Sequence, residues 1–108
     1  MVLLLSTKRR VIRQITITEG ILNQALIHPR EAFQEAVKDS ASAVIFVHNH
    51  PSGDPTPSRD DQVITQRLYK TGNIIGIPVL DHVIIGRENF YSFADEGALA
   101  GEGQGSAG

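Results

Sequence analysis

The chain has 108 residues, with ten basic and twelve acidic side chains, and its formal net charge is −2. This length suits a single domain with a modest core, and the charge balance argues against a protein built to coat a phosphate backbone. The absence of cysteine excludes disulfides and thiolate metal sites. No apolar stretch is long enough to cross a membrane, and the apolar start is too short for a secretory signal, so we expect a cytoplasmic protein.

Two short strands joined by a polar turn are predicted at the start of the chain. Residues 2–5 are apolar, and residues 6–10 are polar and form the turn. Residues 11–18 alternate in character, with Ile15 and Ile17 on one face, which is typical of a half-buried strand.

Two helices and three strands are predicted to follow. Their positions are a helix that begins near Pro29 and closes at Asp39 and Ser40, a strand over 43–47 that leads to His48, a helix over 58–69, a strand over 79–85 and a short strand over 90–93. The predicted apolar faces are Phe33, Ala36 and Val37 in the first helix and Val63, Ile64 and Leu68 in the second. A basic residue followed by glycine, within residues 70–73, indicates the end of the second helix.

The element order β-β-α-β-α-β-β predicts an α/β fold with a mixed β-sheet flanked by helices. The domain is expected to span residues 1–96. Residues 97–108 are rich in glycine and are expected to form a flexible tail.

A candidate metal site lies where a buried strand, two histidines, a turn-rich loop and a helix start follow one another. His48 and His50 are two residues apart, so a strand through them points both rings to the same face. Residues 51–57 contain three prolines and a glycine and therefore form a loop, after which Ser58 opens a helix with Asp61 in its first turn. Two imidazoles and one carboxylate would leave the fourth position of a tetrahedral zinc ion open, as in catalytic sites.

A simpler interpretation needs no metal. Ser58 and Asp61 have the spacing of a helix capping box, and two histidines near a turn can be ordinary surface residues. Each alternative explains its own residues, but the agreement of strand, paired histidines, loop and helix start favours the metal site.

The same residues resemble a known family. The JAMM metalloproteases, or JAB/MPN domain, have the pattern His-x-His, then seven residues, Ser, two residues and Asp. His48, His50, Ser58 and Asp61 have this spacing. Residues 77–82 and 91–93 extend the likeness to the bacterial RadC family, which residues 2–99 resemble as a whole. The adjacent letters His-Asn-His do not indicate an HNH nuclease, because that name refers to three dispersed residues.

The resemblance implies a fold and an activity. The implied fold is the JAB/MPN architecture, which is related to the cytidine deaminase fold, and the implied activity is zinc-dependent hydrolysis of peptide or isopeptide bonds through a metal-activated water. His48, His50 and Asp61 would be the Zn²⁺ ligands, and Ser58 would help to hold the water or the oxyanion formed on attack. The localisation implied is the bacterial cytoplasm.

Three further residues are weaker candidates for the site. Ser52 and Asp54 line the loop and are interpreted first as turn-forming residues and second as substrate contacts. His82 follows Asp81 on a predicted strand, so at most one of the two faces the site, and His82 is the candidate to support a metal ligand from behind.

The general base of the JAMM pattern has no counterpart in this sequence. The family places a glutamate just before the first strand, and no acid precedes Met1. Glu19, Glu31 and Glu35 do not match that place. We therefore expect a fragment that lacks its extreme N-terminal segment and holds metal without the general base.

Two other functions remain as alternatives. One is a DNA repair-associated protein, following the label given to RadC proteins, and the other is a non-catalytic MPN-like interaction domain. The basic residues Lys8, Arg9 and Arg10 are more typical of a solvated turn than of a phosphate contact, so direct DNA binding is not expected. The sequence leaves open the peptide or protein substrate, the oligomeric state and the identity of the metal, since manganese, iron or nickel could occupy a site of two histidines and an aspartate in place of zinc.

Overall fold

The computed structural model describes residues 1–16 and 29–99 as an α/β fold. The elements in chain order are β1 (Val2–Leu5), β2 (Val11–Ile15), α1 (Pro29–Lys38), β3 (Ala43–Asn49), α2 (Arg59–Ile75), β4 (Val79–Ile85) and β5 (Phe90–Ser92). This order is the predicted one, and the α/β class with a mixed sheet is confirmed.

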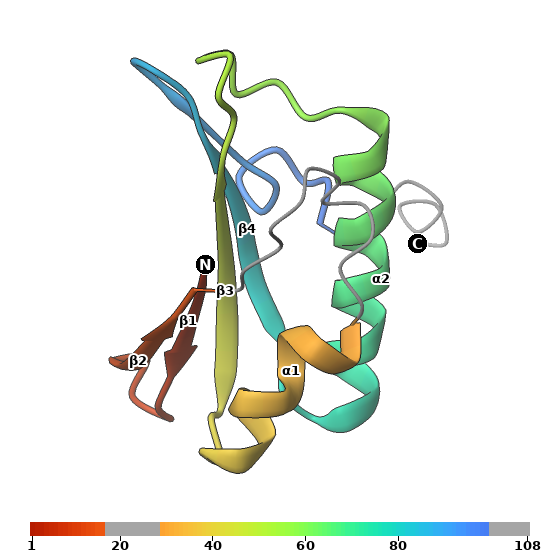
Figure 1. The fold of residues 1–108 in the computed structure, drawn as a ribbon. Helices are drawn as coiled ribbons and strands as arrows, with labels where there is room; N and C mark the ends of the chain where they lie inside the picture. Colours follow the sequence, from red (N-terminus) through yellow and green to blue (C-terminus); the bar gives the residue numbers. More distant parts are fainter. Residues whose placement is uncertain (17–28, 100–108) are drawn as a thin grey trace.

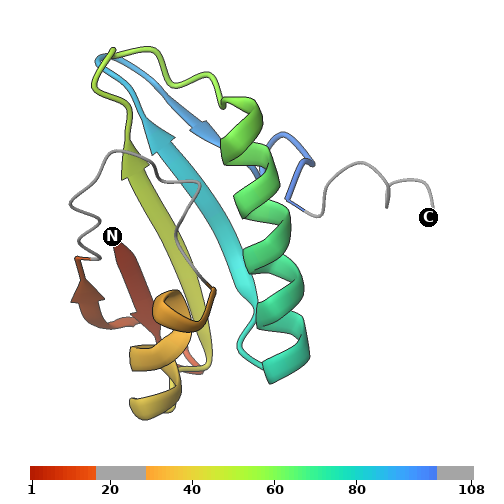
Figure 2. The same cartoon turned by 45° about the vertical axis from the view of Figure 1, so that its right-hand side comes forward.

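The strands form one five-stranded sheet in the order β2-β1-β3-β4-β5. β3 and β4 are parallel, and every other neighbouring pair is antiparallel. The parallel pair is possible because α2 returns the chain to the edge where β3 began. Both helices lie on one face of the sheet (Figures 1 and 2).

The hydrophobic core fills the space between the sheet and the two helices. Phe33 of α1 meets Phe46 of β3 edge to face, with ring centroids 5.8 Å apart. The other fully or nearly buried residues of this cluster include Val2, Leu4, Ala36, Val44, Ile64, Leu68 and Val79. The core thus fixes α2 against the strands β3 and β4.

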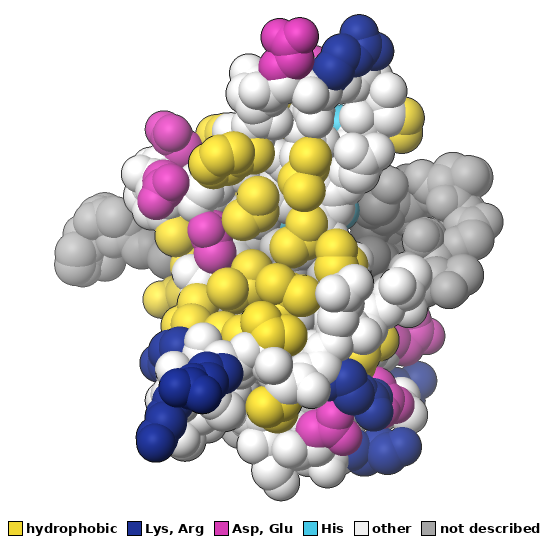
Figure 3. All heavy atoms as spheres, turned by 90° about the vertical axis from the view of Figure 1, so that its left-hand side faces the viewer, with side chains coloured by type: hydrophobic (Ala, Val, Ile, Leu, Met, Phe, Trp, Pro, Cys, Tyr) yellow, Lys and Arg dark blue, Asp and Glu magenta, His cyan; other side chains and the backbone are white. Residues whose placement is uncertain are grey.

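The sheet face turned away from the helices also has apolar side chains. Figure 3 shows them as a broad patch on that face. Ile85 and Phe90 are cross-strand partners there and are 41% and 62% exposed. Neither described helix covers this face.

The predicted end of α2 is wrong, because the helix continues through Gly72 to Ile75. Gly76 ends it with a left-handed backbone, at φ 82°. Gly72 is buried, and a Cβ atom there would lie 2.5 Å from the carbonyl oxygen of Ile77 and 3.3 Å from Phe33. Glycine at position 72 therefore permits close packing and does not end the helix.

The predicted apolar faces need two corrections. Val37 and Val63 are 57% and 48% exposed, whereas Ala32 is buried in α1 and Thr65 in α2. The inner face of each helix is therefore rotated slightly from the predicted one.

The second strand is also less buried than predicted. β2 ends at Ile15, and Ile15 is the only partly buried position in this strand. Arg13 reaches from β2 to α1, where it pairs with Glu35, and also pairs at 3.2 Å with Asp39, the residue after the helix. Ile17 and Thr18 lie outside the described residues.

The end of the described chain stays attached to the domain. Ala98 donates to the carbonyl of Phe93 at 2.9 Å, and Leu99 packs against the core. The tail predicted from Gly97 onward is thus described only at its first three residues. No helix of the described part is long and apolar enough to span a bilayer.

Candidate metal centre

Strand β3 places two imidazole rings side by side at its end. His48 and His50 have ring centroids 4.8 Å apart, while Asn49 between them is exposed. Sheet pairing continues through this end, because the His50 N–H donates to the carbonyl of Ile85 at 3.1 Å. The two histidines therefore lie on the same face, as their spacing indicates.

The start of α2 holds the carboxylate in place. Ser58 is the N-cap, and its Oγ accepts a hydrogen bond from the Asp61 N–H at 3.0 Å. Asp61 Oδ2 in turn accepts from the Ser58 N–H at 2.7 Å, which completes a capping box. The capping box is thus present, and it fixes Asp61 with a side chain that is 5% exposed.

The three side chains converge on one point. Nε2 of His48 lies 3.4 Å from Asp61 Oδ1, and Nε2 of His50 lies 3.0 Å from Asp61 Oδ2. The possible ligand atoms of the three residues all lie within 4.8 Å of one another. Within residues 1–16 and 29–99, this is the group of histidines and acids that could hold a metal ion.

The proton positions of His50 fit a metal ligand. Its Nδ1 lies 2.9 Å from the carbonyl oxygen of Asp54, which can only accept, so Nδ1 carries the hydrogen. In the neutral ring, Nε2 is then a bare lone pair directed at the Asp61 carboxylate. The arrangement needs a positive charge between the two groups.

A positive charge at the same place would also stabilise the buried ring of His48. Its Nε2 is buried without a hydrogen-bond partner, the one such side-chain nitrogen or oxygen in the described part of the chain. Burial lowers the pKa of His48 below its ordinary value, although the nearby Asp61 carboxylate opposes this shift. A proton on His50 would satisfy one ring, whereas a divalent cation bound by the lone pairs of two imidazoles and a carboxylate satisfies all three groups. This donor set suits zinc.

His82 lies directly behind His48. Its Nε2 is 3.1 Å from His48 Nδ1, and its Nδ1 is 2.5 Å from Thr65 Oγ1. The ring stacks on Phe93 with centroids 5.0 Å apart, and burial lowers the pKa of His82 to about 4. Asp81 points the other way and accepts from Ser92 Oγ at 2.6 Å. Of the two neighbours, His82 is therefore the one that contacts the site.

Thr65 is a site residue that the sequence analysis missed. It is 1% exposed, and its hydroxyl donates to the Asp61 carbonyl at 2.7 Å. The available signal was its position four residues after Asp61, which puts both residues on the same helix face.

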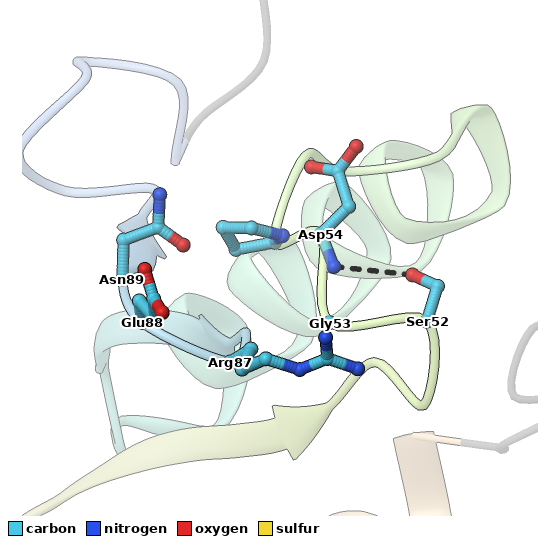
Figure 4. Close-up of a pocket in the computed structure, with 7 residues that line it drawn as sticks. Ser52, Gly53, Asp54, Arg87, Glu88 and Asn89 are labelled. Carbon is cyan, nitrogen blue, oxygen red and sulfur yellow. Dashed lines mark hydrogen bonds between the residues drawn. The ribbon is translucent and has the colours of Figure 1, made fainter.

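The loop after the histidines lines an open pocket of about 460 Å³. Ser52 and Asp54 form turns, since Ser52 Oγ accepts from the Asp54 N–H at 3.2 Å and Asp54 Oδ1 accepts from the Thr56 N–H at 3.0 Å. The hydrogen bonds from Thr56 lower the pKa of Asp54. In Figure 4 the Asp54 carboxylate points away from Arg87. The remaining lining residues are Gly53, Pro55, Arg87, Glu88 and Asn89.

The second side of this pocket was not predicted. Arg87 lies in the turn between β4 and β5, and its N–H donates to the carbonyl of Gly53 at 2.8 Å. This contact joins two loops that are far apart in the sequence, the one that follows β3 and the one that follows β4.

The candidate glutamates do not reach the histidines. Glu31 and Glu35 belong to α1, which lies where β3 begins, whereas the histidines lie where β3 ends (Figure 1). Glu35 also forms ion pairs with Arg13 and Lys38. Glu19 lies outside the described residues.

Known proteins resemble this chain over almost its whole length. A family model described as the RadC-like JAB domain matches residues 1–98. UPF0758 proteins of Pelobacter propionicus and Geobacter sulfurreducens are each 58% identical over 99 residues, and one of Thermotoga maritima is 51% identical over 98 residues. These matches cover 91–92% of this chain but only 43–44% of the relatives, so the chain spans less than half of their length.

Proposed function

Because the chain belongs to the RadC-like JAB domain family, we propose that it is a zinc-dependent metallohydrolase domain that cleaves peptide or isopeptide bonds. The observation that supports this most is the convergence of two imidazole nitrogens on the Asp61 carboxylate, with His48 Nε2 buried and unpartnered. A divalent cation would bind the nitrogen lone pairs and offset the charge of the carboxylate.

His48, His50 and Asp61 would hold the ion. Zinc in such a site would lower the pKa of water and, as a Lewis acid, would polarise a carbonyl. The protein's part is to keep the three ligands fixed, which the end of β3 and the capped start of α2 do.

Ser58 is suited to stabilise negative charge that develops beside this centre. Its Oγ already accepts from the Asp61 N–H, so the cap uses an oxygen lone pair and leaves the hydroxyl hydrogen free to donate. The residue is exposed at the helix N-terminus, where the helix dipole also favours an oxyanion.

Hydrolysis further requires a group that takes a proton from water and delivers it to the leaving amine. Asp61 is occupied as a ligand, and Glu31 and Glu35 belong to α1, which lies where β3 begins and not where the histidines are. We assign this role to a residue outside the described part of the chain.

Elemental analysis of the purified chain tests the metal centre. We expect about one zinc per chain after reconstitution with zinc chloride, and loss of that zinc in His50→Ala. Asn49→Ala is the matched control, because Asn49 is exposed between the two ligands and should leave the zinc content unchanged. Zinc that is absent from the wild type, or retained in His50→Ala, would contradict the proposed site.

Cleavage of quenched fluorescent peptides and of isopeptide-linked peptides tests the reaction itself. In the presence of the segment that supplies the general base, we expect a chelator-sensitive activity that His50→Ala abolishes. A zinc-loaded chain that cleaves neither class, even together with the rest of a full-length relative, would contradict hydrolysis and favour the interaction domain.

A further inference from the structure

Three hydrogen bonds run in series from α2 to the ligand His48. The Thr65 hydroxyl contacts the Asp61 carbonyl at 2.7 Å and His82 Nδ1 at 2.5 Å. His82 Nε2 then contacts His48 Nδ1 at 3.1 Å. The series therefore begins at the backbone of one ligand and ends at the ring of another.

The direction of every bond in this series follows from the first one. A carbonyl oxygen can only accept, so the single hydrogen of Thr65 Oγ1 is donated to Asp61. Thr65 Oγ1 must then accept from His82, which places the His82 hydrogen on Nδ1.

The proton of His48 is fixed by the same reasoning. A neutral His82 ring with its hydrogen on Nδ1 has a lone pair on Nε2 and can only accept there. His48 must therefore donate from Nδ1, which leaves the lone pair of His48 on Nε2. That atom is the one directed toward Asp61 Oδ1, at 3.4 Å.

Packing keeps this series in place. Thr65 and His82 are 1% and 4% exposed, so water does not compete for their hydrogen bonds. The His82 ring lies between Phe93, on which it stacks, and Phe46, which it meets edge to face at 6.5 Å. These contacts oppose rotation of the ring, which would exchange its nitrogens for carbons.

We propose that Thr65 and His82 are positioning residues that hold His48 in the tautomer required of a metal ligand. The inference rests on the proposed metal site and adds to it the part of the chain that prepares the ligand before any metal binds. A ligand whose lone pair is already directed at the site loses little freedom on binding, and such supporting partners are typically worth 10- to 100-fold in metal affinity.

Nitrogen-15 NMR of the imidazole rings in the metal-free protein tests the tautomers directly. At a pH where both rings are neutral, we expect His48 and His82 each to have hydrogen on Nδ1. A hydrogen on Nε2 of either ring would overturn the proposal, and this measurement requires neither zinc nor a substrate.

A matched pair of substitutions tests the consequence for metal binding. Thr65→Val keeps the shape of the side chain but removes the acceptor for His82, and we expect it to weaken zinc binding about 10- to 100-fold in a chelator competition. Thr65→Ser keeps the hydroxyl and should bind zinc as the wild type does. Equal zinc affinity in Thr65→Val and the wild type would overturn the proposal, as would equal losses in both variants.

The two proposals fail in different ways. A wild-type protein that binds zinc but hydrolyses nothing would contradict the proposed reaction and leave the role of Thr65 and His82 intact. A wild-type protein with the expected tautomers and no zinc binding would contradict the metal centre, and with it the role of Thr65 and His82 toward a metal ligand, and would leave only the tautomers as inferred. An unexpected tautomer in a zinc-binding wild type would contradict this inference alone.

Discussion

At the scale of single residues, the geometry of Asp61 fits two roles that compete as explanations of the sequence. A capping box and the proposed metal ligand both account for an acid three residues after Ser58, and the capping geometry leaves room for both. Oδ2 accepts from the Ser58 N–H and faces His50, while Oδ1 faces His48. The cap orients the carboxylate that the two rings share.

Asp61→Asn separates these two roles. The amide oxygen can still accept from Ser58, and the amide N–H₂ can donate to the bare Nε2 of His48. We expect the metal-free variant to be at least as stable as the wild type in urea unfolding, while zinc affinity falls by about 100-fold or more because the charged ligand is lost.

Asp61→Ala is the comparison for this prediction. It loses the reciprocal capping bond as well, so it should lose about 1 kcal/mol of unfolding free energy in addition to the zinc. If Asp61→Asn lost as much stability as Asp61→Ala, the separation of roles would be wrong.

The paired histidines and Asp61 were predictable because each depends on local spacing. His48 and His50 need only the period of a strand, and Asp61 needs only the first turn of a helix. The contact between His82 and Thr65 was not predictable, because it depends on β4 lying beside β3 and on α2 lying over both. Tertiary packing alone brings those two residues together.

At the scale of elements, Gly72 shows why local signals misplaced a helix end. Lys70 and Gly72 have the pattern of a C-terminus, yet the helix runs on to Ile75 because the missing side chain lets α2 approach Phe33 and the segment before β4. Close packing between elements thus overrides a local signal that is usually reliable.

Gly72→Ala tests this explanation. Alanine favours a helix by about 1 kcal/mol over glycine, but its Cβ atom would lie 2.5 Å from the Ile77 carbonyl oxygen. We expect the clash to prevail and the unfolding free energy in urea to fall by about 1–3 kcal/mol. Asn73→Ala, at the neighbouring exposed position, should be neutral or slightly stabilising. A Gly72→Ala variant more stable than the wild type would contradict the packing role.

At the scale of the whole molecule, the element order was sufficient to predict the α/β class. The strand order β2-β1-β3-β4-β5 was not predictable, because it depends on which apolar faces meet in space. The charge of the whole molecule is close to balanced, with a formal net charge of −2. The basic residues Lys8, Arg9 and Arg10 lie together in the turn after β1.

This charge balance predicts that the chain does not bind DNA by itself. We expect no saturable binding of a fluorescent duplex, measured by anisotropy at roughly micromolar protein and physiological salt. Any binding at low salt should disappear as salt is added and should be absent when Lys8, Arg9 and Arg10 are replaced by glutamine. Saturable, salt-resistant binding would contradict this expectation and favour the DNA repair alternative.

The candidate centre is confined to one continuous segment of the chain. Every group of the candidate centre belongs to the strand–helix–strand unit β3-α2-β4 and its connecting loops. These groups are His48, His50, Ser58, Asp61, Thr65 and His82. β1, β2 and α1 supply apolar surface to the core and no ligand. In evolution, the unit that carries the candidate centre can therefore be inherited intact while the elements around it diverge, provided that they continue to cover the same apolar face.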